Sequence, residues 1–299
     1  MLRCFIALAL LGVGAASAPA PPTTWPLQRY VRWEPTWGTR TVSAAGLTAR
    51  VELQRCGENR PASEACYRGD PYLVVTVSGD GMEPVTVQGE PGVAAEIGIG
   101  KLTPGAIRPS LILISENGGS AGCAEIDVAV PQGNAYRLVR LSTDAYDHGT
   151  LCEVDPSRLA WPGDLTGRGR PEFLLRDTRF QCRFTSCAGS WYPPRVVALD
   201  GGRGVDVSDD PALASLYRAD MVKARQACEH HRDEAQGACA GYAFDAARIG
   251  LLPQAWRVIQ AQVKRGCRVR SVEECPDTYK IPATFPKELA AMLPGVDQR

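Results

Sequence analysis

The 299-residue sequence has little histidine and no excess of charge of either sign. It contains three histidines, and its 33 Lys and Arg residues are balanced by 33 Asp and Glu residues. Because a nucleic-acid-binding protein carries a basic excess that neutralises phosphates, this balance argues against such a partner. Intrinsic disorder needs low hydrophobicity and high net charge, whereas 44% of these residues are hydrophobic. The composition is typical of a globular protein of one or two domains.

Long hydrophobic runs are also missing, apart from a short one at the start of the chain. Residues 1–20 read MLRCFIALALLGVGAASAPA, with a basic Arg3, an apolar run and then small residues. This pattern is typical of a secretory signal peptide, which we expect at residues 1–18, with cleavage after Ala16 or Ser17 as alternatives. A retained membrane anchor is the competing interpretation. We expect a secreted or periplasmic protein with no membrane span after signal removal.

Cysteine is the residue type present in excess, with eleven in the chain. Loss of Cys4 with the signal peptide would leave ten cysteines, an even number that predicts disulfides in an exported protein. Connectivity does not follow from spacing, but sequential pairing is the simplest hypothesis: Cys56–Cys66, Cys123–Cys152, Cys182–Cys187, Cys228–Cys239 and Cys267–Cys275. A zinc site is the alternative, disfavoured because the chain has no C-x-x-C pair.

The pattern of apolar residues predicts an α+β protein in two parts. We expect a proline- and aromatic-rich segment at 19–50, a β-rich domain at 51–208 and a helical C-terminal domain at 209–299. Short apolar runs predict strands at 72–77, 110–115, 124–130, 136–141, 172–177 and 195–200. Three of these strands open alike, with a charged residue and a proline at 70–71, 108–109 and 170–171, which suggests repeated β-hairpin units. Apolar residues recur at helical spacing in the next part of the chain, which predicts helices at 211–232, 234–249 and 253–264.

The most informative motif is DLTGRGRPEF at 164–173. It resembles the calcium-loop turn of FG-GAP/VCBS repeats, the blades of integrin-type β-propellers, through Asp164, two glycines, a proline and Glu172. Thr166 and Arg168 stand where the family has further oxygen ligands. Because calcium takes six to eight oxygens, we expect no metal here. Our hypothesis is that Arg168 replaces the ion by bridging Asp164 and Glu172.

The strand openings, this turn and the helical tail together resemble uncharacterised exported bacterial proteins with FG-GAP-like β segments and a C-terminal helical region. The resemblance covers about residues 70–265 and implies a partial propeller-like β part followed by a small disulfide-stapled helical part. It implies no activity, because the group has none to transfer.

Other motifs carry weaker signals. Gly118-Gly119-Ser120-Ala121-Gly122 fits the G-x-S-x-G elbow of hydrolases, but a strand pattern follows where the elbow needs a helix. Neighbouring His230 and His231 point about 100° apart on a helix, which disfavours a shared metal. An N-terminal aromatic group offers candidate binding residues that could stack on sugars or fill a groove: Trp25, Trp33 and Trp37.

We therefore expect an exported, non-catalytic binding or structural protein without a cofactor. Its partner would be a protein or glycan of the envelope or the exterior. The alternative from another class is an inhibitor of an envelope or host enzyme, and a less favoured one is a serine hydrolase that uses Ser120.

Overall fold

The computed structural model describes residues 23–24, 27–54, 72–91, 94–116, 124–141, 159–187, 189–230, 235–265, 281 and 284–293. Within these residues the fold is α+β, as the sequence predicts. Several mainly antiparallel sheets are followed by a helical region that contains a disulfide.

The first sheet has five strands in the order β1-β3-β4-β5-β6. They are β1 (Thr23–Thr24), β3 (Arg40–Ala44), β4 (Leu47–Gln54), β5 (Tyr72–Gly79) and β6 (Val85–Pro91). Strands β3 to β6 are antiparallel, and β1 pairs in parallel with β3. Ala45 and Gly46 join β3 to β4 at φ 50° and 81°. Two consecutive left-handed residues form the tight hairpin turn whose twist matches that of the strands.

The second sheet also has five strands, in the order β10-β9-β8-β7-β2, all antiparallel. They are β2 (Tyr30–Trp33), β7 (Ala95–Gly100), β8 (Ser110–Glu116), β9 (Ala124–Gln132) and β10 (Ala135–Arg140). Strands β2 and β3 come from the segment at 19–50, so this segment takes part in both sheets.

The first two sheets share one core, formed by alternate residues of their strands. Members of this core include Val42, Ala49, Val51, Val75, Val77, Ile97, Ile99, Leu111 and Leu113. In β8 the intervening residues Ile112 and Ile114 are buried as well, because they pack in a second core with strands of a third sheet. Burial on both faces explains why β8 reads as the continuous apolar run SLILIS rather than an alternating one.

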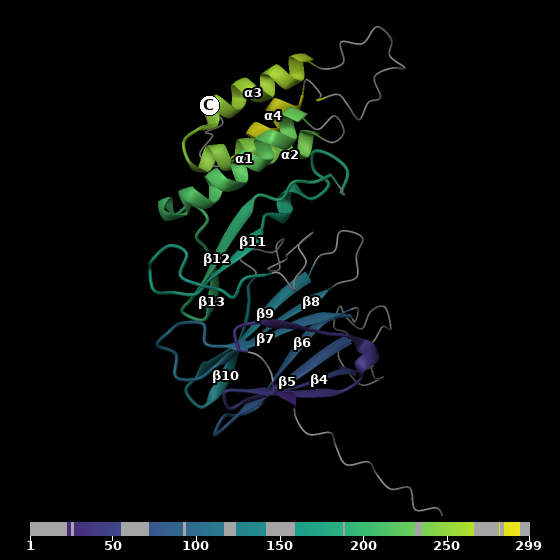
Figure 1. The fold of residues 1–299 in the computed structure, drawn as a ribbon, viewed down its shortest axis with the longest axis vertical. Helices are drawn as coiled ribbons and strands as arrows, with labels where there is room; N and C mark the ends of the chain where they lie inside the picture. Colours follow the sequence, from purple (N-terminus) through teal and green to yellow (C-terminus); the bar gives the residue numbers. More distant parts are fainter. Residues whose placement is uncertain are drawn as a thin grey trace, which may run out of the picture.

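The third sheet lies between the two larger sheets and the helices (Figure 1). It contains β11 (Glu172–Arg176), β12 (Pro194–Asp200) and β13 (Arg203–Asp206), in that order and antiparallel. The side chains that face the second sheet are Phe173, Leu175, Val197 and Leu199. On the opposite face Val196 packs with Leu213 and Tyr217 at the start of the helical region.

The helical region contains η5 (Pro211–Leu213), α1 (Ala214–His230), α2 (Ala235–Arg248), α3 (Leu252–Arg265) and α4 (Phe285–Ala290). The predicted helices at 211–232, 234–249 and 253–264 correspond to α1, together with η5 before it, to α2 and to α3. Asp210 caps η5, because its carboxylate accepts a hydrogen bond from the amide of Ala212 at 3.0 Å. Gly250, at φ +73°, ends α2 in the left-handed conformation that favours glycine.

All six strands predicted from the sequence are present, as β5, β8, β9, β10, β11 and β12. The three similar openings lead into β5, β8 and β11, which belong to three different sheets. The repeat hypothesis itself stays a prediction, as do the domain boundaries at 51 and 209.

Two of the sequential disulfides are present, Cys182–Cys187 and Cys228–Cys239. The second joins α1 to α2 and lies inside the helical core. The other six cysteines of the predicted pairs, Cys56, Cys66, Cys123, Cys152, Cys267 and Cys275, lie outside the described residues.

Candidate functional site

The FG-GAP-like turn leads directly into β11. Gly163 and Glu172 close its ends with two backbone hydrogen bonds of 3.2 and 2.8 Å. Gly167 and Gly169 lie at φ +75° and +74°, a region that side-chain-bearing residues rarely adopt. The glycine spacing in the motif is therefore a direct requirement of the backbone path.

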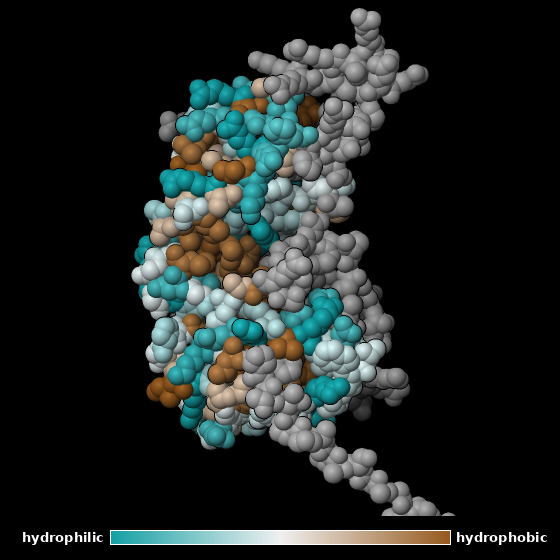
Figure 2. Space-filling view, in the orientation of Figure 1, coloured by the Kyte–Doolittle hydropathy of each residue, from teal (hydrophilic) through white to brown (hydrophobic). Residues whose placement is uncertain are grey.

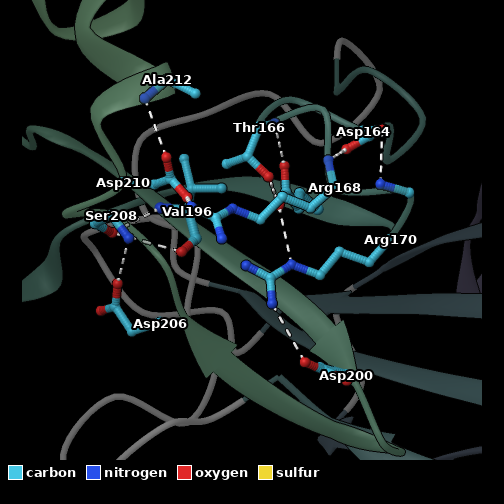
Figure 3. Close-up of polar contacts among 12 residues, drawn as sticks. Asp164, Thr166, Arg168, Arg170, Val196, Asp200, Asp206, Ser208, Asp210 and Ala212 are labelled. Atoms are coloured by element: carbon cyan, nitrogen blue, oxygen red, sulfur yellow. Dashed lines mark hydrogen bonds and ion pairs between the residues drawn. The ribbon is translucent and has the colours of Figure 1, made fainter.

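The carboxylate of Asp164 folds back over this turn. It accepts hydrogen bonds from the backbone amides of Arg168, at 2.7 Å, and Gly169, at 2.9 Å (Figure 3). Consecutive amides that converge on one carboxylate stabilise the negative charge in the way that a helix N-cap does.

Glu172 supplies the second carboxylate and is buried, with 1% of its surface exposed. It accepts hydrogen bonds from the amide of Thr166 at 2.7 Å and from its hydroxyl at 2.5 Å. The guanidinium of Arg170 adds a third donor at 3.3 Å. Both carboxylates that the resemblance makes calcium ligands thus face N–H and O–H hydrogens of their own turn, and a cation would have to displace these donors.

The hypothesis that Arg168 bridges Asp164 and Glu172 is wrong. Its guanidinium pairs instead with Asp210 at 2.6 Å. Arg170 is the residue whose guanidinium contacts Glu172, and it also pairs with Asp200 at 3.2 Å (Figure 3). The left-handed glycines on either side of Arg168 hold its amide over Asp164 while its side chain reaches the connection to the helices.

That connection, between β13 and α1, is built from short polar side chains. The hydroxyl of Ser208 accepts a hydrogen bond from the amide of Val196 at 2.9 Å, which holds the segment to β12. Burial raises the pKa of Asp206, but hydrogen bonds from Ser208 and the charge of Arg195 outweigh it, so the pKa is lowered overall. The ion pair between Arg168 and Asp210 therefore links the turn, and with it the third sheet, to the start of the helical region at η5.

In the described part of the chain, no group of three or more His, Cys, Asp or Glu residues is arranged to hold a metal ion. His230 instead places its Nδ1 atom 2.9 Å from the carbonyl oxygen of Gln226 in its own helix. His231 lies outside the described residues.

A cavity of about 650 Å³ opens on the seam between the second and third sheets. Its second-sheet wall is the β7–β8 connection and the β9–β10 hairpin, and its third-sheet wall is the start of β11 and the β12–β13 turn. The lining residues are Leu102, Thr103, Gly105, Ala106, Ile107, Arg108, Ser110, Val130, Pro131, Gly133, Pro171, Leu199 and Gly202. The volume falls within the range of about 300–1,000 Å³ that is usual for small-molecule sites.

Ile107 marks the β7–β8 side of this cavity and is 92% exposed. Burial of an isoleucine side chain against an apolar group is favourable by about 1.5–3 kcal/mol. Arg108, beside it, donates a hydrogen bond to the carbonyl oxygen of Gly133 at 3.0 Å, which holds the two second-sheet loops together. Figure 2 shows hydrophobic residues gathered near the middle of the molecule, at the level of the third sheet.

The aromatic binding hypothesis is wrong for Trp33. This side chain is 2% exposed, belongs to the core of the two larger sheets, and donates a hydrogen bond to the carbonyl oxygen of Gly38 at 3.2 Å. A ring buried in this way cannot stack on a ligand. Trp37 is 45% exposed, with the guanidinium of Arg40 lying 6.0 Å from its ring centroid. Trp25 and Ser120 lie outside the described residues.

Sequence reasoning missed a buried acidic pair in the helical region. Asp245 of α2 is 0% exposed and Asp220 of α1 is 8% exposed. Asp220 accepts hydrogen bonds from Trp191 at 3.0 Å and Arg176 at 3.4 Å. Burial first, and then the charge of Asp220, raise the pKa of Asp245 well above its usual value. The sequence feature that could have indicated a buried carboxyl group is the position of Asp245 in the middle of the apolar run AGYAFDAA.

We expect Asp164→Ala to lower the free energy of unfolding by about 1 kcal/mol, because two amides lose the acceptor that caps them. Millimolar calcium should leave the Tm of the wild-type protein unchanged in differential scanning calorimetry. Asp200→Ala is the control: it removes a surface ion pair and should cost no more than about 0.5 kcal/mol. A calcium-dependent rise in Tm that Asp164→Ala abolishes would refute this interpretation of the turn.

The family described as the sll0997 C-terminal domain matches residues 216–295 of this chain. A curated relative is 27% identical over 154 residues, which are 50% of this chain: the "Probable thylakoid lumen protein sll0997" of Synechocystis sp. (strain ATCC 27184 / PCC 6803 / Kazusa). The chain spans 43% of the length of that relative. No solved structure matches the chain. None of the helices in the described residues is long and apolar enough to cross a membrane.

Proposed function

We propose that this chain is an exported, non-catalytic binding protein that takes a small apolar ligand in the cavity on the seam between the second and third sheets. The observation that carries the proposal is the cavity itself, with an isoleucine 92% exposed at its edge. Export is supported by the probable lumenal location of the relative and by the two disulfides.

The lining supports an apolar ligand over a glycan. The residues that line the cavity are mainly Gly, Ala, Val, Leu, Ile and Pro, and none of them carries an aromatic ring on which a sugar could stack. Polar groups are few: the guanidinium of Arg108 and the hydroxyls of Thr103 and Ser110. Arg108 favours a ligand with one anionic or hydrogen-bond-accepting group at its end.

We also propose that the turn at 164–172 is an FG-GAP-like turn that has become a metal-free structural element. The support is local: the glycine spacing, the closed ends and the internal donors on both carboxylates. In this role the turn holds Pro171 at the cavity and Arg168 on the helical region.

The apolar anion 1-anilinonaphthalene-8-sulfonate tests the binding proposal as a fluorescent probe. We expect saturable binding to the folded protein, with a Kd at least about tenfold weaker in Ile107→Asp, because the aspartate replaces an apolar contact with a charge. The matched control is Val222→Asp, which changes another exposed apolar residue, 63% exposed on α1. Unchanged affinity in Ile107→Asp, or an equal loss in Val222→Asp, would contradict the proposed site.

A further inference from the structure

The two disulfides of the described chain differ in their exposure to solvent. Cys228 and Cys239 are 1% and 0% exposed and lie in the helical core. Cys182 and Cys187 are both exposed, in the loop that follows η4 (Thr178–Phe180). Exchange with a thiol requires direct approach to a sulfur atom, so the two bridges present different targets to a reductant.

The exposed bridge sits in a tightly folded loop. Cys182 lies at φ 51°, in the left-handed region that a non-glycine residue enters at a cost. Its amide donates a hydrogen bond to the hydroxyl of Ser190 at 2.8 Å, and this hydroxyl donates to the carbonyl oxygen of Ser186 at 3.0 Å. The covalent ring between Cys182 and Cys187 encloses Ser186, so the bridge and these hydrogen bonds support one loop conformation.

Two phenylalanines, one at the end of η4 and one inside the disulfide-closed loop, enter the helical core. Phe180 and Phe184 are 2% and 7% exposed, and each stands two residues from Cys182. Phe180 packs edge-on against Phe244 of α2, with ring centroids 4.9 Å apart. Phe184 packs in the same way against Phe285 of α4, at 5.4 Å. The disulfide-closed loop thus holds one of the side chains on which α4 packs.

We propose that Cys182–Cys187 is a reducible regulatory disulfide whose state controls how firmly α4 is held on the core. The co-reactant is a dithiol, either small or on a protein. Its thiolate attacks one cysteine sulfur, a mixed disulfide forms as the Cys182–Cys187 bond breaks, and the released thiolate takes a proton. The second thiol of the reagent then attacks the reagent's own sulfur in the mixed disulfide and releases the cysteine that was attacked first, whose thiolate also takes a proton. The dithiol is thereby oxidised to a disulfide, and two electrons and two protons pass to the cysteine pair. Free of the ring, Cys182 leaves the left-handed region and Phe184 loses its fixed position.

Partial reduction of the native full-length protein with dithiothreitol tests this inference, which does not depend on the proposed ligand. After alkylation, peptide mapping by mass spectrometry assigns each modified cysteine. We expect Cys182 and Cys187 to be modified at least about tenfold faster than Cys228 and Cys239, because reduction of the buried pair requires the helical core to open first. Reduction of both pairs at one rate would overturn the proposal.

Hydrogen exchange supplies the second readout. Amides of α4 should exchange at least about tenfold faster after selective reduction. The double variant Cys182→Ser/Cys187→Ser should show the same fast exchange without reductant and no further response to dithiothreitol. If α4 exchanges at the wild-type oxidised rate in both the reduced protein and the variant, the bridge does not control the helix and the inference fails.

Discussion

Asp245→Asn is expected to become progressively more stable than the wild-type protein as the pH rises above about 4. The difference in free energy of unfolding should grow by about 1.4 kcal/mol per pH unit up to the folded-state pKa of Asp245. This pKa is raised well above its ordinary value, mainly by burial. The variant replaces the carboxyl group with a neutral amide of nearly the same shape, so it has no proton to lose.

The sign follows from the number of bound protons. An unfolded aspartate loses its proton near pH 3.9, whereas folded Asp245 keeps it to higher pH. Between these values the folded state binds one more proton, so the wild-type stability is complete below the unfolded pKa and falls as the pH rises through the window. The groups around Asp245 oppose each other: Asp220 raises its pKa, and Arg248 and Arg176 lower it.

Urea denaturation followed by circular dichroism at a series of pH values provides the measurement. Asp127→Asn is the matched control: burial raises the pKa of Asp127 too, although Arg140 beside it works in the opposite direction. Asp127 lies in β9, far from Asp245 in the fold. In the double variant, the two changes in the free energy of unfolding should therefore add without coupling. A variant Asp245→Asn whose stability follows the wild-type pH dependence would show that the buried carboxyl is not the titrating group.

Gly241→Ala is expected to destabilise the protein by about 2–3 kcal/mol, although the same change in an ordinary helix stabilises it by about 1 kcal/mol. A methyl group at residue 241 would overlap the indole ring of Trp191. The ring cannot simply withdraw, because its Nε1 donates a hydrogen bond to Asp220 at 3.0 Å. The close approach of α2 to residue 191 is thus possible only with glycine.

Chemical denaturation measures this effect, and Gly163→Ala is the control. A methyl group at residue 163 would meet open space, so this change should shift stability by less than about 0.5 kcal/mol. In a double-mutant cycle, Trp191→Leu should relieve much of the penalty of Gly241→Ala, because the smaller side chain removes the overlap. A stabilising Gly241→Ala would mean that the helix and the indole are farther apart than in the structure.

Much of the β architecture was predictable because its signals are local. The runs at 72–77 and 110–115 have the composition of strands, and each forms one. The start of the helical region likewise followed from Asp210 and the proline after it, which begin η5 immediately before α1. The strands that escaped prediction are β1, β2, β3, β4, β6, β7 and β13. In β6 and β13 several residues are partly exposed and the sequence includes Gly, Gln and Asp, so their strand state depends on pairing with a neighbour.

The candidate site was predictable only in part. The glycine and carboxylate spacing located the turn, and the turn does bring Thr166 and Glu172 together. The positions of its arginines were not predictable, because the reach of a long side chain depends on what surrounds it. Asp210, to which Arg168 pairs, is 42 residues further along the chain. The cavity has no sequence signature, since its two walls come from different sheets.

Local chemistry alone therefore determined six of the strands, the helices α1 to α3, the tight turn at 164–172 and two of the disulfide pairs, because each depends on residues near one another in the chain. Tertiary structure decided which strands share a sheet, the destination of Arg168, the raised pKa of Asp245 and the cavity beside Ile107. These features depend on distances between segments far apart in sequence, and such distances are set only when the sheets and helices pack.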